Sequence, residues 1–114
     1  MAEPRLATHM RVSALIRQCA AQGDFATVIR KGDAIAGSLL LLTRIKGQNP
    51  VLYERFPAPD GAMEWQTVGM QTSDLEKELD EYLGRRSTRD PDIWVLELDV
   101  AFAERLDGLL GQHS

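Results

Sequence analysis

Residues 38–56 read SLLLLTRIKGQNPVLYERF, and this stretch decides the predicted fold. Two apolar runs flank the polar segment 46–49 (KGQN), which has the residues of a tight turn. The pattern predicts two antiparallel strands, over 38–45 and 51–56, joined by a hairpin. A further run at 25–30 (FATVIR) is rich in the β-branched and aromatic residues that favour strands. We therefore expect these three strands to form an antiparallel meander.

Apolar residues outside the meander recur with periods that predict helices and two more strands. The expected helices span 10–23, 74–89 and 101–110, and the expected strands span 63–68 and 93–98. These elements indicate an α+β domain, an antiparallel sheet of about five strands with two or three helices packed on one face. We expect one domain over 1–114, with a core at about 6–99 and a C-terminal extension at 100–114 that can form a short helix.

The middle helix carries its own boundary signals. Ser73 and Glu76 have the spacing of a capping box, in which the serine oxygen accepts a hydrogen bond from the backbone N–H of Glu76. Acidic residues follow in its first turns, and Arg85, Arg86 and Arg89 lie near its end, the order that complements the helix dipole. We therefore expect these charges to stabilise the helix.

Composition and length exclude several classes of protein. With 114 residues, 44% hydrophobic and 26% charged, the chain is typical of a single globular domain. Its longest apolar run, at 39–42, is far shorter than the roughly 20 residues of a transmembrane helix. The N-terminus lacks the pattern of a secretory leader. We therefore expect no membrane contact and a cytoplasmic location.

The single cysteine and the two histidines indicate core packing and chain ends, not a reactive site. Cys19 lies on the apolar stripe of the first predicted helix, where a thiol acts as a small hydrophobic side chain with a raised pKa. Trp94 begins an apolar run directly after a helix stop, so we expect it in the core as well. His9 and His113 lie near opposite ends of the chain. We predict no metal, no cofactor and no serine-type catalytic arrangement.

Charge is unevenly divided along the chain. The formal net charge is −4, yet residues 1–56 carry eight basic and four acidic side chains, whereas residues 57–114 carry five and thirteen. An acidic protein lacks the surplus of lysine and arginine on which nonspecific nucleic-acid binding depends, so we expect no nucleic-acid partner. The uneven division indicates either charge complementarity inside one domain or a basic patch for an anionic partner.

A hairpin turn centred on Gly47 and Gln48 would place Leu42 opposite Tyr53. This register sorts the side chains of the meander between the two faces of the sheet, because successive residues of a strand point to opposite sides. One face becomes apolar enough to pack against the helices. The other becomes an apolar centre ringed by basic residues. It supplies the candidate binding residues Arg30, Arg44, Tyr53, Arg55, Leu40 and Leu42.

Three interpretations of this amphipathic face stay open. An apolar centre with a polar rim is typical of a protein interface, which favours a homodimer or another protein as the partner. Guanidinium groups also bind oxyanions, which would suit a nucleotide or a carboxylate. Alternatively, the acidic C-terminal segment covers the leucines and pairs with the arginines. We predict a noncatalytic binding or protein-interaction module, with a small anionic-ligand-binding protein or enzyme as the alternative.

Two short polar motifs are weak signals for chemistry. Asp90 and Asp92 flank a proline at a predicted helix–strand junction, where paired carboxylates can serve acid–base or metal chemistry. This corner is the second place at which the alternative enzyme or ligand site could lie, although aspartate is common at such junctions. In segment 30–33 (RKGD) we expect Gly32 to adopt a positive φ and Asp33 to accept turn hydrogen bonds. No residue is predicted to be catalytic.

Two segments taken together resemble a known family. The first is 30–33 (RKGD) with Gly37, and the second, more specific one is 89–95 (RDPDIWV). Their order and spacing resemble the bacterial domain-of-unknown-function family DUF1491 over about 6–99, whereas 101–114 looks specific to this chain. The resemblance implies a small α+β domain and brings no activity, cofactor or site residue with it.

Overall fold

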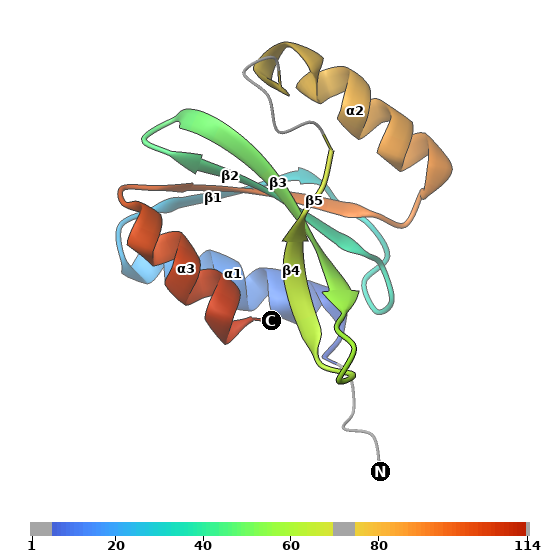
Figure 1. The fold of residues 1–114 in the computed structure, drawn as a ribbon, viewed down its shortest axis with the longest axis horizontal. Helices are drawn as coiled ribbons and strands as arrows, with labels where there is room; N and C mark the ends of the chain where they lie inside the picture. Colours follow the sequence, from blue (N-terminus) through green and yellow to red (C-terminus); the bar gives the residue numbers. More distant parts are fainter. Residues whose placement is uncertain (1–5, 70–74, 114) are drawn as a thin grey trace.

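The computed structural model describes residues 6–69 and 75–113, which form one five-stranded sheet with three helices (Figure 1). The strands are β1 (Phe25–Arg30), β2 (Leu39–Ile45), β3 (Gln48–Pro57), β4 (Met63–Thr67) and β5 (Trp94–Val100). The helices are α1 (Thr8–Ala21), α2 (Leu75–Arg89) and α3 (Ala103–Gln112). The expected α+β class and five-stranded sheet are therefore confirmed.

The order of the strands differs from the expected meander. It is β1-β5-β2-β3-β4, so the last strand of the chain lies between the first two. β5 pairs antiparallel with β1 and parallel with β2, whereas β2–β3 and β3–β4 are antiparallel. β5 takes a central position because it carries buried apolar side chains on both faces. The prediction that β1 and β2 are neighbours is wrong.

The turn between β2 and β3 begins one residue earlier than expected. Lys46 and Gly47 occupy its two central positions, with φ of 51° and 74°, and Ile45 pairs with Gln48. Positive φ at both central residues produces a turn whose twist matches that of the flanking strands. The two-residue turn at Lys46 and Gly47 therefore fits the twist of β2 and β3 better than the predicted turn.

A bulge follows this turn, and the register beyond it differs from the predicted one by one residue. Leu42 lies opposite Leu52, whereas the prediction placed it opposite Tyr53. Because side chains alternate along a strand, this shift moves all of β3 to the other face relative to β2. The expected grouping of arginines around leucines depended on that register and is wrong.

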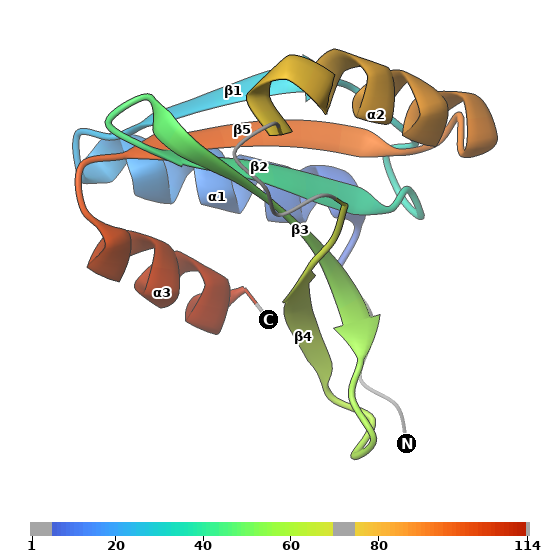
Figure 2. The same cartoon turned by 45° about the horizontal axis from the view of Figure 1, so that its top comes forward.

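Helices cover both faces of the sheet, which corrects the expectation that they share one face. α1 and α3 lie against one face and α2 lies across the other (Figure 2). The cause is the run 39–42 of β2, whose four leucines point alternately to the two sides and are all buried. A strand with apolar side chains on both faces needs a cover on each.

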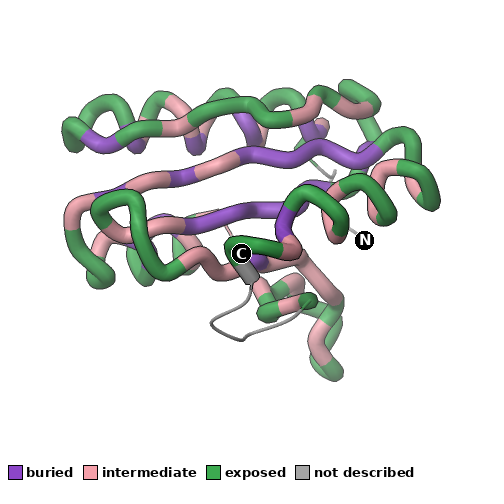
Figure 3. Tube along the Cα trace, turned by 90° about the horizontal axis from the view of Figure 1, so that it is seen from above, coloured by how far each residue is buried: buried purple, intermediate pink, exposed green. Residues whose placement is uncertain are grey.

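Two apolar clusters form the core, one on each face of the sheet, and most of β2 and β5 is buried between them (Figure 3). The cluster under α1 and α3 has as its buried members Val12, Leu15, Cys19, Leu39, Leu41, Trp94, Leu96, Leu98, Val100, Leu106 and Leu109. The cluster under α2 has Leu40, Leu42, Leu52, Leu79, Ile93 and Val95. The prediction that Cys19 and Trp94 belong to the core is confirmed.

The positions of the helices and strands agree with the expected ones to within a few residues. α1 ends at Ala21, and Gly23 follows with a φ of 79°, as expected of a glycine after a helix. The capping box at Ser73 lies outside the described residues. Among those that are described, no helix has the length and apolar character that a membrane crossing requires.

Candidate functional site

The six residues predicted to form one binding face are divided between the two faces of the sheet. Leu40 and Leu42 belong to the cluster that α2 covers, and they are 0% and 1% exposed. Tyr53 packs against the cluster on the other side of the sheet. Arg55 shares the face of Tyr53 because the two residues are two positions apart on β3. The predicted site is therefore not one surface.

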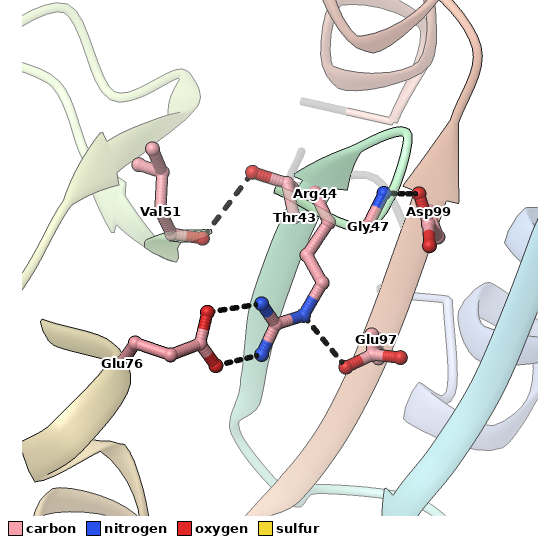
Figure 4. A network of polar contacts seen from close by, with 7 residues as sticks. All are labelled: Thr43, Arg44, Gly47, Val51, Glu76, Glu97 and Asp99. Atoms are coloured by element: carbon pink, nitrogen blue, oxygen red, sulfur yellow. Dashed lines mark hydrogen bonds and ion pairs between the residues drawn. The ribbon is translucent and has the colours of Figure 1, made fainter. Parts of the chain in front are cut away.

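Arg44 holds α2 against the sheet (Figure 4). Its guanidinium donates two hydrogen bonds, of 2.7 and 2.8 Å, to the Glu76 carboxylate and one of 3.2 Å to Glu97. The hydrogen bonds with Glu76 raise the pKa of Arg44, and they lower the pKa of Glu76. Because the Arg44 side chain is only 13% exposed, it acts as an anchor between β2 and α2.

Arg55 lies on the opposite face as part of a cationic cluster. Its guanidinium carbon is 5.8 Å from the ring centroid of Trp65, its partner across β3 and β4. Arg11 of α1 donates a 3.1 Å hydrogen bond to the backbone carbonyl of His113. Burial, followed by the charges of Arg11 and Arg55, lowers the pKa of His113. The cluster therefore connects α1, the end of α3 and β3.

Arg30 is tied to the corner that contains Asp90 and Asp92. Its guanidinium donates to the carbonyl oxygen of Pro91 at 2.8 Å. The Asp90 carboxylate accepts from the backbone N–H of Asp92 at 3.2 Å. The corner is thus held by hydrogen bonds that shape a turn. Across the two described segments, no group of three or more ligating side chains could hold a metal ion.

Gly32 and Gly37 are required by a close approach of two chain segments. Neither has a positive φ, which corrects the expectation for Gly32. A β-carbon on either glycine would overlap the carbonyl oxygen of Asp92. Asp33 accepts two hydrogen bonds from backbone N–H groups of its own loop, at 3.1 and 2.8 Å, so its predicted role in the turn is confirmed.

Trp94 completes this contact from the other side. Its indole N–H donates to the carbonyl oxygen of Asp33 at 2.7 Å, and its backbone N–H donates to that of Ser38 at 2.8 Å. Trp94 as a whole is 5% exposed. Segments 30–37 and 89–95 therefore form one structural unit, whose polar groups hold the backbone in place.

The edge strand β1 exposes apolar side chains to solvent. Phe25, Val28 and Ile29 are 73%, 41% and 49% exposed. Among the described strands, β1 pairs only with β5, so its outer backbone edge is open. These residues form a surface that the sequence analysis did not include among the candidates.

A groove of about 590 Å³ lies between the second half of α2 and β3. Arg86 crosses its inner wall, where it donates to Glu54 at 2.5 Å and to the Tyr82 hydroxyl at 3.1 Å. Burial lowers the pKa of Arg86, but the hydrogen bonds with Glu54 and Tyr82 outweigh burial and raise it. The residues that line the groove are Glu54, Phe56, Val68, Tyr82, Arg85, Arg86, Arg89 and Asp90.

Comparison with family models assigns the chain over most of its length. The model described as "Protein of unknown function (DUF1491)" matches residues 6–106. The chain belongs to the DUF1491 family. Both segments that carried the resemblance lie inside this match. The match also extends past Asp99 into α3, where Leu106 is buried in the core.

Solved structures of DUF1491 proteins share the fold. A crystal structure from Caulobacter crescentus CB15 is 37% identical, with a TM-score of 0.73, and the alignment covers 85% of this chain and 90% of that one. An NMR structure from the same organism is 36% identical over 86% and 88%, with a TM-score of 0.69. The solution structure of a protein from A. tumefaciens is 30% identical over 85% and 87%, with a TM-score of 0.65. No curated protein matches the chain.

Sequence reasoning missed two surfaces, the open edge of β1 and the groove between α2 and β3. They differ in whether a local sequence pattern indicates them. The openness of β1 depends on strand order, because β1 becomes an edge only when β5 takes its inner side. The groove has a local signal, since Tyr82, Arg85, Arg86 and Arg89 recur at helical spacing and so share one side of α2. This signal was interpreted as complementing the helix dipole alone.

Proposed function

We propose that this DUF1491 protein is a noncatalytic interaction module that pairs with a second copy of itself through the open edge of β1. The observation that supports this proposal is the exposure of Phe25, Val28 and Ile29 on a strand with an unpaired outer edge. The backbone N–H and C=O groups of such an edge can pair with another strand. Apolar side chains beside them lose water when that strand arrives.

The two edges of the sheet differ in how they are protected against pairing. β4, at the far edge, carries Glu64, Gln66 and Thr67 within five residues. β1 carries no charge and no proline before its last residue, Arg30. Charges, prolines and bulges keep edge strands from pairing, and of these β1 has before Arg30 only an irregularity, between Val28 and Arg30. This contrast favours β1 as the interaction surface.

Two-fold symmetry restricts how β1 can pair with its own copy. With the axis beside Thr27, Ala26 of each copy lies opposite Val28 of the other. Phe25 lies opposite Ile29, at the irregular end of the strand where the register with β5 shifts. Each of these pairs brings apolar side chains together across the new contact, and such cross-strand pairs stabilise antiparallel sheets. The strand is therefore self-complementary in this register.

Charge along the strand favours the same antiparallel arrangement. β1 begins opposite Asp99 of β5 and ends at Arg30, which Lys31 follows. An antiparallel partner places the basic end of one copy beside the acidic start of the other. A parallel partner would place like charges together, which costs free energy.

Sedimentation velocity across a concentration series tests the proposal. We expect reversible association that rises with concentration, because a contact of six residues per copy falls below the about 1,200 Å² of a stable interface. Phe25→Lys and Ile29→Glu should each leave a monomer. The variant carrying both substitutions should associate again, because the introduced charges would then face each other.

A matched control is Ile35→Lys, since Ile35 is an isoleucine that is 73% exposed but lies outside β1. This variant should associate as the wild type does. A wild-type protein that stays monomeric at every concentration would overturn the proposal. If both single variants are monomeric and the double variant does not associate, β1 is still the interaction surface, but the proposed pairing of Phe25 with Ile29 is wrong.

We also propose that the protein is bacterial and that it is located in the cytoplasm. The solved relatives come from C. crescentus and A. tumefaciens, and the only cysteine is a buried free thiol, which suits a reducing compartment. Recovery of the native protein from the periplasm on cell fractionation would contradict it.

The arginine-lined groove favours a second candidate function, the binding of a small anion.

A further inference from the structure

We propose that the groove between α2 and β3 binds a small organic anion, with its phosphate or carboxylate head held by Arg85 and Arg89 and its apolar body against Phe56 and Val68. This site is separate from the β1 edge and would operate in a monomer or a dimer. Its volume of about 590 Å³ is in the range of pockets that hold small molecules.

The side of α2 that faces the sheet changes character along the helix. Leu79 is buried, and Leu83, one turn later, packs against the same apolar cluster. Arg85, Arg86 and Arg89 line the groove with Tyr82 from the neighbouring side of the helix, where Arg85 and Arg89 are exposed. Of the three, Arg86 lies against the sheet, where it is 19% exposed and bonded to Glu54 of β3, so a charged side chain ends the apolar cover here. The result is a polar opening where the cluster could have continued.

Complementing the helix dipole does not account for this placement. A positive charge in the last turn stabilises a helix from any side of its axis. Arg85, Arg86 and Arg89 instead recur at i, i+1 and i+4 on the side that faces β3, together with the ring of Tyr82. The guanidinium carbons of Arg85 and Arg86 are each 6.0 Å from that ring.

The three arginines differ in how far their guanidinium groups are already engaged by acidic side chains. Arg86 is 19% exposed and engaged with Glu54, so it builds the wall. Arg85 makes an exposed ion pair with Glu81, in which the two side chains are 59% and 74% exposed, and a ligand can replace it at little cost. Within 6–69 and 75–113 no acidic side chain pairs with Arg89. Two guanidinium groups are therefore available at the groove.

The other lining residues define the class of ligand. Asp90, the remaining acidic residue, already accepts a backbone hydrogen bond at the corner. Phe56 and Val68 are half-buried and supply the apolar part of the lining. Guanidinium groups bind phosphate and carboxylate through paired hydrogen bonds. A ligand with one such head and an apolar body matches both walls.

An NMR titration of the ¹⁵N-labelled full chain tests the site, with phenyl phosphate and benzoate as the two oxyanion probes. Phenol is the control for the apolar body alone, and inorganic phosphate is the control for the anionic head alone. We expect phenyl phosphate, benzoate or both to shift amides of residues 54–56 and 82–90 with saturation. Each control should bind about ten-fold or more weakly than the better probe.

Two double variants decide whether the groove arginines hold the anion. Arg85→Gln with Arg89→Gln should weaken binding about ten-fold or more, the effect of losing charge-assisted hydrogen bonds. Arg17→Gln with Lys77→Gln removes two exposed charges elsewhere and should change affinity less than about two-fold. Unchanged thermal unfolding and amide dispersion in both variants establish that the fold is intact.

Three results would overturn the proposal. The first is the absence of saturable shifts for both oxyanion probes up to about 10 mM, well above a Kd of about 1 mM. The second is equal weakening in the two double variants, which would show attraction to net charge alone. The third is inorganic phosphate binding as tightly as phenyl phosphate, which would leave no role for the apolar wall.

Discussion

The carbonyl oxygen of Asp92 occupies the space that a β-carbon on Gly32 would need. The same hypothetical β-carbon would lie 2.6 Å from the carbonyl carbon of Ile93. Asp33 donates its backbone N–H to the Asp92 oxygen at 3.0 Å, so the approach is a hydrogen-bonded one. The loop after β1 and the corner before β5 can therefore meet only where the first of them lacks side chains.

We expect Gly32→Ala to destabilise the protein by about 3 kcal/mol or more, because the overlap is with backbone that cannot turn aside. Gly108→Ala is the matched control, since Gly108 lies within α3 and a β-carbon there meets nothing within 4 Å. The control should be stabilised by about 0.5–1 kcal/mol. Chemical denaturation of both variants measures the difference, and a Gly32→Ala variant as stable as wild type would contradict the close approach.

Trp94 should contribute to stability through both packing and its indole N–H. Trp94→Ala should cost about 3–5 kcal/mol because it empties a buried site. Trp94→Phe keeps much of the apolar volume but leaves the Asp33 carbonyl without its donor, so it should cost about 1–3 kcal/mol. Urea unfolding gives both values. Equal losses in the two variants would mean that the hydrogen bond accounts for the whole effect.

Arg44→Met should destabilise the protein by about 1–2 kcal/mol, a discounted value because Glu76 is 56% exposed. The variant removes the tie between β2 and the N-terminal half of α2 and leaves Glu97 of β5 without its cation. Arg85→Met is the control, because its pair with Glu81 is exposed and should contribute less than about 0.5 kcal/mol. Thermal unfolding compares them, and similar losses would refute the anchoring role of Arg44.

His113 should make stability dependent on pH. Burial, with the charges of Arg11 and Arg55, lowers its pKa from the ordinary 6.5. The unfolded chain therefore binds a proton more readily than the folded one. This contribution is complete above pH 6.5 and is lost as the pH falls from 6.5 through the folded-state pKa.

The measurement is the free energy of unfolding between about pH 7.5 and about pH 5, a range that brackets the ordinary histidine pKa. As the pH falls over this range, the free energy of unfolding of His113→Asn should decline less steeply than that of the wild type. His9→Asn, at an exposed histidine, is the control and should keep the wild-type slope. Identical slopes in all three proteins would contradict the lowered pKa of His113.

Cys19 should be unreactive in the native protein. It is fully buried, and burial, with a smaller effect from Asp24, raises its pKa to about 11. Only about one thiol in a thousand is then ionised at pH 8. Alkylation by iodoacetamide should be at least about 100-fold slower than in denaturant. Rapid labelling under native conditions would show that α1 opens readily.

Local sequence was sufficient for the helices and strands but not for their order. The segment 25–30 and the segment 94–100 each have clear strand composition, and both form strands. Their pairing depends on contacts between residues that are about seventy positions apart. The four leucines at 39–42 did carry the information that both faces would be covered, because a strand with one solvated face alternates apolar and polar residues.

The candidate binding face failed for a reason of backbone geometry. Lys46 adopts a positive φ, which is uncommon for a residue with a side chain, and the turn is therefore one residue earlier than composition suggested. That step alone would have kept Tyr53 and Arg55 on the face of Arg44, because it shifts the pairing by two residues. The bulge between Thr43 and Ile45 changes the shift to one residue and moves them to the other face. The DUF1491 segments, by contrast, are recognised from the residues themselves and need no register. They lie together because the glycines allow the close approach and Trp94 bonds to Asp33.

The central place of β5 also affects the order in which the chain can fold during synthesis. When β1 and β2 have left the ribosome, the strand that belongs between them has not yet been made. Each of the two then presents an unpaired edge to other nascent chains, which is a route to aggregation. A peptide of residues 94–113, which carries β5 and α3, supplied in trans to a chain that ends before β5 would fill this gap, so the molecule is suited to a split-protein complementation design.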